Sequence, residues 1–155
     1  AGLITAARME AEQLARRAFI TQTLDLSLTC WPPDGCIRLP LPPAASVTSI
    51  TYYDWTNASH TMSSSDYIVV TDIDPAVITL ALNKTWPTDP LREVAPIRVR
   101  YVAGYGATAG SVPERYRALI RSLVLVRYES RDELTATQER QLQNIRSALR
   151  MDYGW

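Results

Sequence analysis

Helical spacing of apolar residues marks the start of the chain. Over residues 3–19, small and aliphatic side chains recur every three or four positions. The opposite face carries charged residues at i, i+4 spacing, Arg8, Glu12 and Arg16. From residue 20 the period changes to two, and leucines alternate with threonine, aspartate and serine up to residue 30. The pattern predicts an amphipathic helix over 1–19, followed directly by a half-buried strand.

Short alternating segments rich in threonine, tyrosine and β-branched residues fill the middle of the chain. They predict further strands over residues 47–54, 60–62, 67–71, 77–81 and 97–103. The segment 37–45 contains three prolines, which lack backbone donors, so we expect an edge strand or an extended connection there and not a central strand. Loops are expected at 55–59 and 83–96. Together these elements predict a small antiparallel sheet or sandwich inserted over 20–106.

The period returns to helical after the glycine-rich segment 104–110. Ser111 and Glu114 have capping-box spacing with Pro113 between them, which predicts a helix over 113–129. Thr135 and Gln138 repeat that spacing before a last helix that ends near residue 150. This helix has only a narrow apolar stripe, typical of a surface helix or of one docked on another subunit: Leu142, Ile145, Ala148 and Leu149.

The expected fold class is therefore α+β, with an N-terminal helix, an inserted β part and two C-terminal helices. We expect one domain over 1–155, with a helix at 1–19, the β insertion at 20–106, helices at 111–150 and an apolar tail at 151–155. A length of 155 residues with 46% hydrophobic and 21% charged residues fits one globular domain. Neither a membrane-spanning segment nor a signal peptide is expected.

The charges balance to a formal net charge of zero, which argues against a protein that coats nucleic acid through bulk electrostatics. Their distribution is uneven. Residues 20–96 carry three basic residues against eight acidic ones, whereas residues 97–155 carry ten arginines against six acids. The middle of the chain is therefore acidic and its C-terminal part basic, and 15 of the 16 basic residues are arginine, a residue enriched at interfaces.

Four groups of residues are candidates for a catalytic, cofactor or metal site. The segment 104–109 resembles the glycine fingerprint of dinucleotide-binding proteins. The next helix, however, begins only at the cap Ser111, five residues after the second glycine, so a glycine-rich turn is expected. His60 is expected in a solvated hairpin, and Asp72 with Asp74 in a polar turn closed by proline. Cys30 and Cys36 are expected as reduced thiols packed as small apolar groups. We therefore predict no catalytic, cofactor or metal site.

Two features suggest contacts with other proteins instead. The Arg-rich helix 113–129 also carries acids, so salt bridges at the surface or between subunits are expected in preference to DNA binding. The tail carries Met151, Tyr153 and Trp155, side chains that bury a large apolar area when they have a partner. The tail either folds back on its own domain or docks on another protein.

The order of the segments resembles one known family. Residues 3–8 lead into 15–23, residues 37–43 precede 47–50, and residues 99–106 precede the helix that begins at 112–113 and reaches 128–131. In this order the chain resembles the head-to-tail connector (adaptor) proteins of tailed phages and phage-like gene transfer agents. The resemblance implies a non-enzymatic neck protein of the virion, assembled in the host cytoplasm, without cofactor or membrane contact. It also implies a ring of about twelve copies between the portal and the stopper or tail-completion protein, through which DNA passes without sequence-specific binding.

On that basis, Met151, Tyr153 and Trp155 are predicted to dock on the portal. Contacts between subunits are predicted for residues of the two C-terminal helices: Arg115, Arg121, Leu142, Ile145 and Leu149. Two alternatives stay open. One is a small α+β ligand-binding or enzymatic domain that uses His60 and the hairpin 52–55. The other is a DNA-binding module that uses the Arg-rich helix 113–129.

Overall fold

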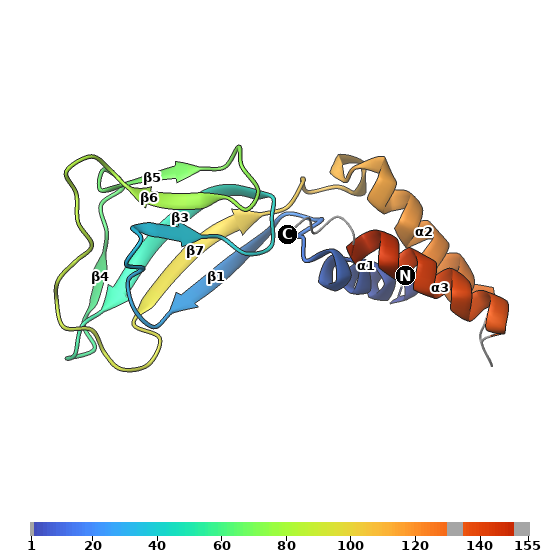
Figure 1. Ribbon diagram of the computed structural model, residues 1–155, viewed down its shortest axis with the longest axis horizontal. Helices are drawn as coiled ribbons and strands as arrows, with labels where there is room; N and C mark the ends of the chain where they lie inside the picture. Colours follow the sequence, from blue (N-terminus) through green and yellow to red (C-terminus); the bar gives the residue numbers. More distant parts are fainter. Residues whose placement is uncertain (1, 130–134, 151–155) are drawn as a thin grey trace. The chain divides into compact units, whose positions relative to one another are not determined.

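The computed structural model describes residues 2–129 and 135–150. It divides into two compact units (Figure 1). The helical unit combines Ala1–Ile20 with Tyr105–Trp155, and the β unit is Thr21–Gly104. The α+β fold class is therefore confirmed, with the β unit inserted between helical segments that pack together. One adaptor domain over 1–155 stays a prediction.

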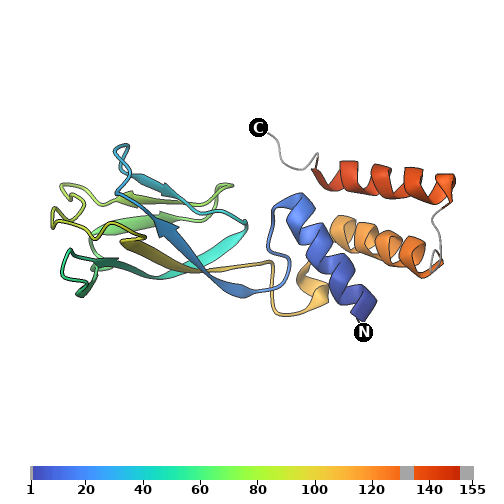
Figure 2. The same cartoon turned by 90° about the horizontal axis from the view of Figure 1, so that it is seen from below.

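The helical unit contains α1 (Gly2–Ala15), a short 3₁₀ turn η1 (Ala109–Ser111), α2 (Glu114–Glu129) and α3 (Ala136–Arg150). Each α-helix contacts the other two, as Figure 2 shows. Their apolar faces and the joining segments form one core: Ala7, Ala11, Ala15, Phe19, Val112, Tyr116, Leu123, Val126, Leu142 and Leu149. Three alanines on α1 bring its backbone close to the larger side chains of α2 and α3.

Helix α1 ends earlier than the predicted residue 19. Arg16 has a φ of 46°, and its N–H donates to Gln13 O at 3.4 Å, while Arg17 N donates to Glu12 O at 3.1 Å. This pair of bonds is a Schellman motif, in which a left-handed residue follows the last helical one. The apolar periodicity of the sequence continues into 16–19 because Ala18 and Phe19 are also buried, although they are not helical.

Arg16→Gly is expected to stabilise the helical unit by roughly 0.5 kcal/mol. Glycine reaches the left-handed region without the Cβ clash of arginine, and this gain exceeds the extra entropy of glycine in the unfolded chain. Urea unfolding followed by the helical circular dichroism signal measures the change. Gln13→Gly on the same helix is the control, and it should destabilise the unit, because Gln13 is helical and exposed.

Two glutamates of α1 hold the helical unit together. Glu10 Oε1 accepts a hydrogen bond from Arg146 Nε at 3.1 Å, and its Oε2 pairs with Arg127, so one carboxylate joins all three helices. Glu12 Oε1 accepts a hydrogen bond from Phe19 N at 2.8 Å. This second carboxylate fixes the turn of the chain after α1 and places the Phe19 ring in the core.

Only one of the two predicted capping boxes forms. Thr135 and Gln138 make the reciprocal pair, with Thr135 N donating to Gln138 Oε1 at 3.0 Å and Gln138 N donating to Thr135 Oγ1 at 3.4 Å. At the start of α2 the prediction is wrong. Ser111 belongs to η1, and the Glu114 carboxylate pairs with Arg117 and Arg121 instead.

The first sheet of the β unit has the order β1-β7-β3-β4, with every pair antiparallel. Its strands are β1 (Gln22–Leu28), β3 (Ala44–Tyr53), β4 (Ser59–Thr61) and β7 (Ile97–Ala103). Asp25 lies opposite Arg100 in the register, and the two side chains form a bidentate pair with N···O distances of 2.8 and 2.9 Å. This cross-strand pair supports the register of β1 on β7.

The second sheet has the order β2-β6-β5, from β2 (Cys36–Arg38), β5 (Tyr67–Val70) and β6 (Val77–Leu80). The two sheets form separate layers in Figure 2, and both contribute buried residues. Ile37 and Ile78 come from this sheet, and Ile50, Val99 and Tyr101 from the first. Of the two predicted alternatives, a single sheet or a sandwich, the β unit therefore forms the sandwich.

Two details of the β unit differ from the sequence-based expectation. The segment 37–45 splits, because its prolines separate the edge strand β2 from β3, whose first residues Ala44 and Ala45 belong to a central strand. Cys30 and Cys36 are free thiols, as predicted, but Cys30 is exposed and does not pack as a small apolar residue.

Candidate functional site

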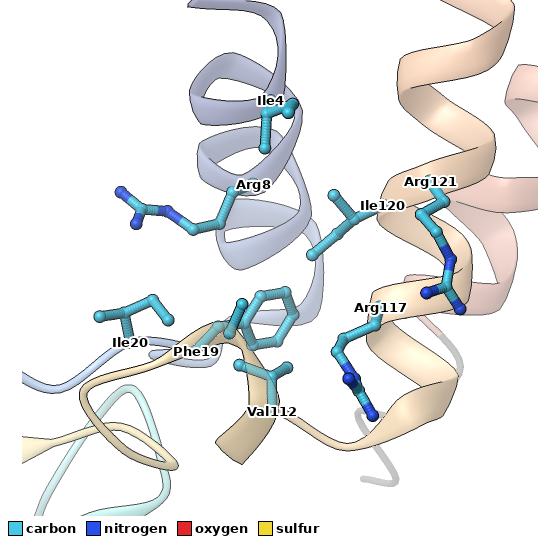
Figure 3. Close-up of a pocket in the computed structure, with 9 residues that line it drawn as sticks. Ile4, Arg8, Phe19, Ile20, Val112, Arg117, Ile120 and Arg121 are labelled. Atoms are coloured by element: carbon cyan, nitrogen blue, oxygen red, sulfur yellow. The ribbon is translucent and has the colours of Figure 1, made fainter. Parts of the chain in front are cut away.

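A hollow in the helical unit lies between α1 and α2 (Figure 3). It is a cavity of about 290 Å³ that adjoins a second hollow of about 310 Å³, and the two share Ile4, Ile120 and Arg121. We call the combined feature the α1–α2 groove. Its lining residues are Ile4, Arg8, Phe19, Ile20, Ala109, Val112, Arg117, Ile120, Arg121, Val124, Leu125 and Tyr128.

The floor of the groove is apolar. In Figure 3, Ile4 on α1 and Ile120 on α2 face each other across the groove, with Phe19 and Val112 at its base. The Phe19 ring is fully buried and packs on Tyr116 with ring centroids 4.7 Å apart. The base is therefore part of the core, and the groove is a rigid depression of the helical unit.

Apolar residues of both helices stay open to solvent along the groove. Ile4 is 61% exposed, Leu125 56% and Tyr128 57%. Ile120 and Tyr128 lie eight residues apart on α2, so two turns of the helix present this apolar surface. Exposed apolar side chains that adjoin one another are typical of an interaction surface.

Arginines form the rim. Arg8 lies on one side of the groove, and Arg117 and Arg121 lie on the other (Figure 3). Arg117 and Arg121 pair with the Glu114 carboxylate, and the hydrogen bond from Arg121 is the main reason why the pKa of Glu114 is lowered. The Nε atoms of Arg8 and Arg117 are shielded from solvent and make no hydrogen bond. Arg8 Nε also lies 3.9 Å from Glu12 Oε2, so each rim arginine has an acidic neighbour within the chain. Three guanidinium groups face two carboxylates, and the rim keeps a net positive charge.

The predicted contact residues of α2 are exposed. Arg115 donates to Tyr116 Oη at 2.9 Å, and its guanidinium lies 4.6 Å from the centroid of that ring. Arg121 belongs to the groove rim, and its side chain is 65% exposed. Both arginines are accessible on the helical unit, and their contact with another subunit stays a prediction.

The apolar stripe of α3 has a different explanation from the predicted one. Leu142 is 5% exposed and Leu149 is fully buried, and both belong to the core shared with α1 and α2. Intrachain packing accounts for these two side chains without a neighbouring subunit. Ile145 is half-buried and lines a separate hollow between α2 and α3, so it stays a candidate for contact with another copy. Met151, Tyr153 and Trp155 lie outside the described residues.

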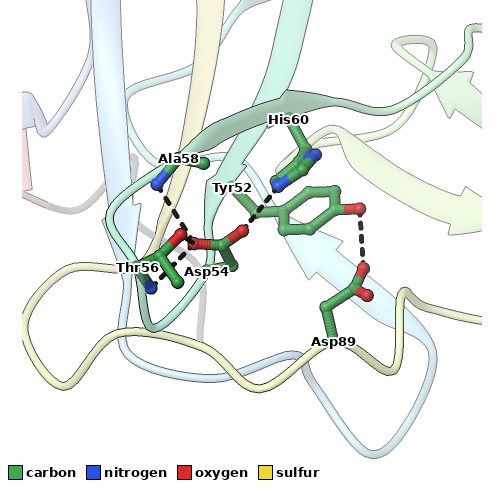
Figure 4. A network of polar contacts seen from close by, with 6 residues as sticks. All are labelled: Tyr52, Asp54, Thr56, Ala58, His60 and Asp89. Atoms are coloured by element: carbon green, nitrogen blue, oxygen red, sulfur yellow. Dashed lines mark hydrogen bonds and ion pairs between the residues drawn. The ribbon is translucent and has the colours of Figure 1, made fainter.

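The hairpin around His60 is exposed to solvent, as predicted, and its turn holds an ordered polar network (Figure 4). Asp54 Oδ2 lies 2.9 Å from His60 Nε2, and Asp54 Oδ1 accepts hydrogen bonds from Thr56 N at 2.8 Å and Ala58 N at 3.1 Å. The His60 ring stacks on Tyr52, with centroids 5.1 Å apart. The histidine thus closes the β3–β4 turn.

The Asp54 network makes this turn sensitive to acid. Hydrogen bonds from the side chains of Thr56 and then His60 lower the pKa of Asp54 from 3.8 to about 2. Since the folded pKa lies below the unfolded one, the stabilisation is fully present above about pH 4 and is lost as the pH falls through about 2. We expect the Thr56 and Ala58 amide resonances to shift with a midpoint near pH 2, and Asp54→Asn to abolish that transition. A midpoint near 3.8 would contradict the prediction.

The glycine-rich segment acts as a turn, as predicted. Gly104 and Gly106 have φ values of 126° and 159°. Gly106 forms an isolated parallel bridge with Ile20 and approaches Ser111 closely. Within residues 2–129 and 135–150, no cluster of three or more histidine, cysteine or acidic side chains has metal-binding geometry. Over the same described residues, no helix has the length and hydropathy of a membrane span.

Sequence reasoning missed most of the groove. The apolar spacing places Ile4, Ile120 and Val124 on the buried faces of their predicted helices, but Ile4 is exposed and the other two are only partly buried. Leu125 and Tyr128 were not singled out. One available signal was the breadth of the apolar face of α2. Which part stays open depends on how α1 and α3 pack.

Comparisons with known proteins bear on the fold. The chain matches no protein-family model, and no curated protein matches it either. It is similar to a chain in the virion of a native gene transfer agent (GTA) particle, with a TM-score of 0.77 and 21% identity over 96% of this chain and 75% of that one. A chain in the native GTA neck, computed with C12 symmetry, has a TM-score of 0.79 and 22% identity, with 96% and 80% coverage. A chain in the neck of an empty GTA particle, computed with C6 symmetry, has the same TM-score and identity, with 96% and 76% coverage.

These likenesses establish a shared fold across nearly the whole chain, including both units. The similar chains are components of virion and neck structures.

Proposed function

We propose that this chain is a structural neck protein of a gene transfer agent or phage-like particle, and more specifically a head-to-tail connector. The observation that carries the proposal is the similarity of fold to chains of GTA necks over 96% of the sequence. The order of helices and strands that suggested the connector family from sequence also occurs in the structure. A non-catalytic role agrees with a site that consists of an apolar groove and an arginine rim.

In this role the chain forms a ring, with about twelve copies as the expected number. The C12 and C6 symmetries of the similar necks support a cyclic arrangement. The ring joins the portal of the DNA-filled head to the stopper or tail-completion protein and extends the DNA channel. Arg115, Arg121 and Ile145 are accessible or partly accessible on the helical unit, so they remain the residues for contacts between copies.

Imaging of purified particles tests the neck assignment. The chain should appear as a cyclic ring between head and tail, and antibody labelling of a tagged chain should mark the same place. A particle whose neck lacks the chain would overturn the proposal. Retention of the isolated chain on DNA in a salt-dependent manner, without any portal protein, would support the DNA-binding alternative instead.

The portal contact of Met151, Tyr153 and Trp155 is tested separately. A chain that ends at Arg150 keeps all of α3, whose Leu149 is buried in the helical core, and removes only the tail. We expect its attachment to filled heads to fall about tenfold or more, as for the loss of a buried aromatic anchor. Val94→Ser, at an exposed position of the β unit, is the matched control and should attach normally. Normal attachment of the truncated chain would refute the tail contact and leave the ring role intact.

A further inference from the structure

An exposed loop of the β unit has the chemistry that complements the α1–α2 groove. Residues 71–76 connect β5 to β6, and the first four of them, 71–74, are all exposed. The Ile73 side chain is 49% exposed, and it stands between Asp72 and Asp74. Of the exposed large apolar side chains in residues 2–129 and 135–150, Ile73 is the one with an acidic residue on each side in the sequence.

The groove presents the opposite arrangement. Its main cavity of about 290 Å³ has an apolar floor, and the residues that line it include three arginines and no acidic residue. Glu12 and Glu114 pair with these arginines from outside the lining, which leaves one positive charge in excess. A branched aliphatic side chain fits a cavity of this size, and carboxylates next to it would reach the rim guanidinium groups. Arginine and carboxylate make short, charge-assisted hydrogen bonds, which add geometric specificity to the apolar contact.

Cyclic symmetry gives the reason why a second copy is the partner. In a closed ring of identical chains, a surface on one copy must meet a different surface on the next. The similar chains occur in necks with C12 and C6 symmetry. The chain itself carries two unlike surfaces of complementary charge, the groove on the helical unit and the loop on the β unit.

We propose that the loop 71–74 of one copy docks in the α1–α2 groove of the neighbouring copy. Ile73 enters the apolar cavity, and Asp72 and Asp74 meet the rim arginines Arg8 and Arg117. The inference rests on the proposed ring, since it names the contact that joins one copy to the next. It also links the acidic β unit of one chain to the basic helical unit of another.

Cysteine cross-linking in assembled particles tests this contact. Two variants of the full chain are co-expressed in a Cys30→Ser, Cys36→Ser background, one with Ile73→Cys and the other with Ile4→Cys, an exposed edge of the groove. After mild oxidation, we expect about tenfold more disulfide-linked dimer than in the controls, because docking holds the two thiols at a high effective concentration. Dimers between the two variants can form only between different chains.

Matched controls place a cysteine at other exposed positions that lie outside the contact. Met9→Cys is on the same helix as Ile4 and is 53% exposed, and it is paired with Ile73→Cys. Leu82→Cys lies on the β unit and is paired with Ile4→Cys. A neck that contains the chain but gives no more cross-link than these controls would overturn the docking and leave the proposed function standing. Absence of the chain from the neck would overturn both.

A charge exchange provides a second readout. Asp72→Arg should lower the recovery of assembled rings about tenfold, since a close charge pair becomes repulsive, and Arg8→Asp in the same chain should restore most of it.

In a single chain with both Ile4→Cys and Ile73→Cys, a disulfide that forms only within the monomer would refute the assignment to a second copy.

Discussion

Phe19→Ala is expected to lower the free energy of unfolding of the helical unit by about 4 kcal/mol, within the range for a large aromatic side chain removed from a core. Phe19 is fully buried, packs on Tyr116 at 4.7 Å between ring centroids, and its backbone N–H is held by Glu12. Its removal leaves a cavity at the base of the α1–α2 groove. The neighbouring backbone is fixed by Glu12 and by the bond from Tyr105 N to Phe19 O, so the cavity cannot easily collapse.

Urea unfolding, followed by the helical circular dichroism signal, measures this effect. Phe19→Leu keeps most of the apolar volume and should cost much less, about 1 kcal/mol. Met9→Ala removes an apolar side chain from the exposed face of the preceding helix and should change stability by less than about 0.5 kcal/mol. A cost for Phe19→Ala no larger than that of Met9→Ala would show that Phe19 is not part of a close-packed core.

Gly106→Ala is expected to destabilise the helical unit by about 2 kcal/mol, since overpacking at a constrained position has this order of cost. A Cβ at residue 106 would lie 2.4 Å from Ser111 Oγ and 2.5 Å from Ser111 Cβ. The φ of 159° also disfavours a side chain. The turn cannot shift freely, because Gly106 bridges to Ile20.

A second substitution separates the clash from the backbone strain. Ser111→Gly removes both clashing atoms, so the double variant Gly106→Ala, Ser111→Gly should recover part of the loss relative to the sum of the single changes. Gly110→Ala is the control, because a Cβ there meets only Thr108 Oγ1 at 3.8 Å. If Gly106→Ala were as well tolerated as Gly110→Ala, the close approach of the turn to η1 would be refuted.

Local patterns predicted most elements because they depend on neighbours in sequence. The strand at 97–103 matches β7 in both of its ends, since alternation decides which residues of a strand are buried. The capping box at Thr135 and Gln138 could also be predicted from the sequence, because both partners lie within four residues. At Ser111 the same spacing predicted a capping box that does not form. The Glu114 carboxylate pairs instead with Arg117 and Arg121, one and two turns further along α2.

The packing of the three helices and the candidate site were harder to predict because their parts are distant in sequence. The Glu10 carboxylate joins Arg127 and Arg146, which are 117 and 136 residues away. The groove combines residues near position 4 with residues near position 120. No periodicity within a short window reports such pairings, so the apolar face of α2 gave no indication of which positions stay exposed.

The sequence by itself determined the order and type of the elements, the charge contrast between the β middle and the helical C-terminal part, and a resemblance to connectors carried by that order. These properties follow from short-range spacing and composition. Only the tertiary structure decided that Leu142 and Leu149 are buried within the chain, and that Ile4, Leu125 and Tyr128 are exposed beside an arginine rim. The reason is physical: an amphipathic helix specifies a face to be covered, but the helices that pack on it determine how much of that face is left for a partner.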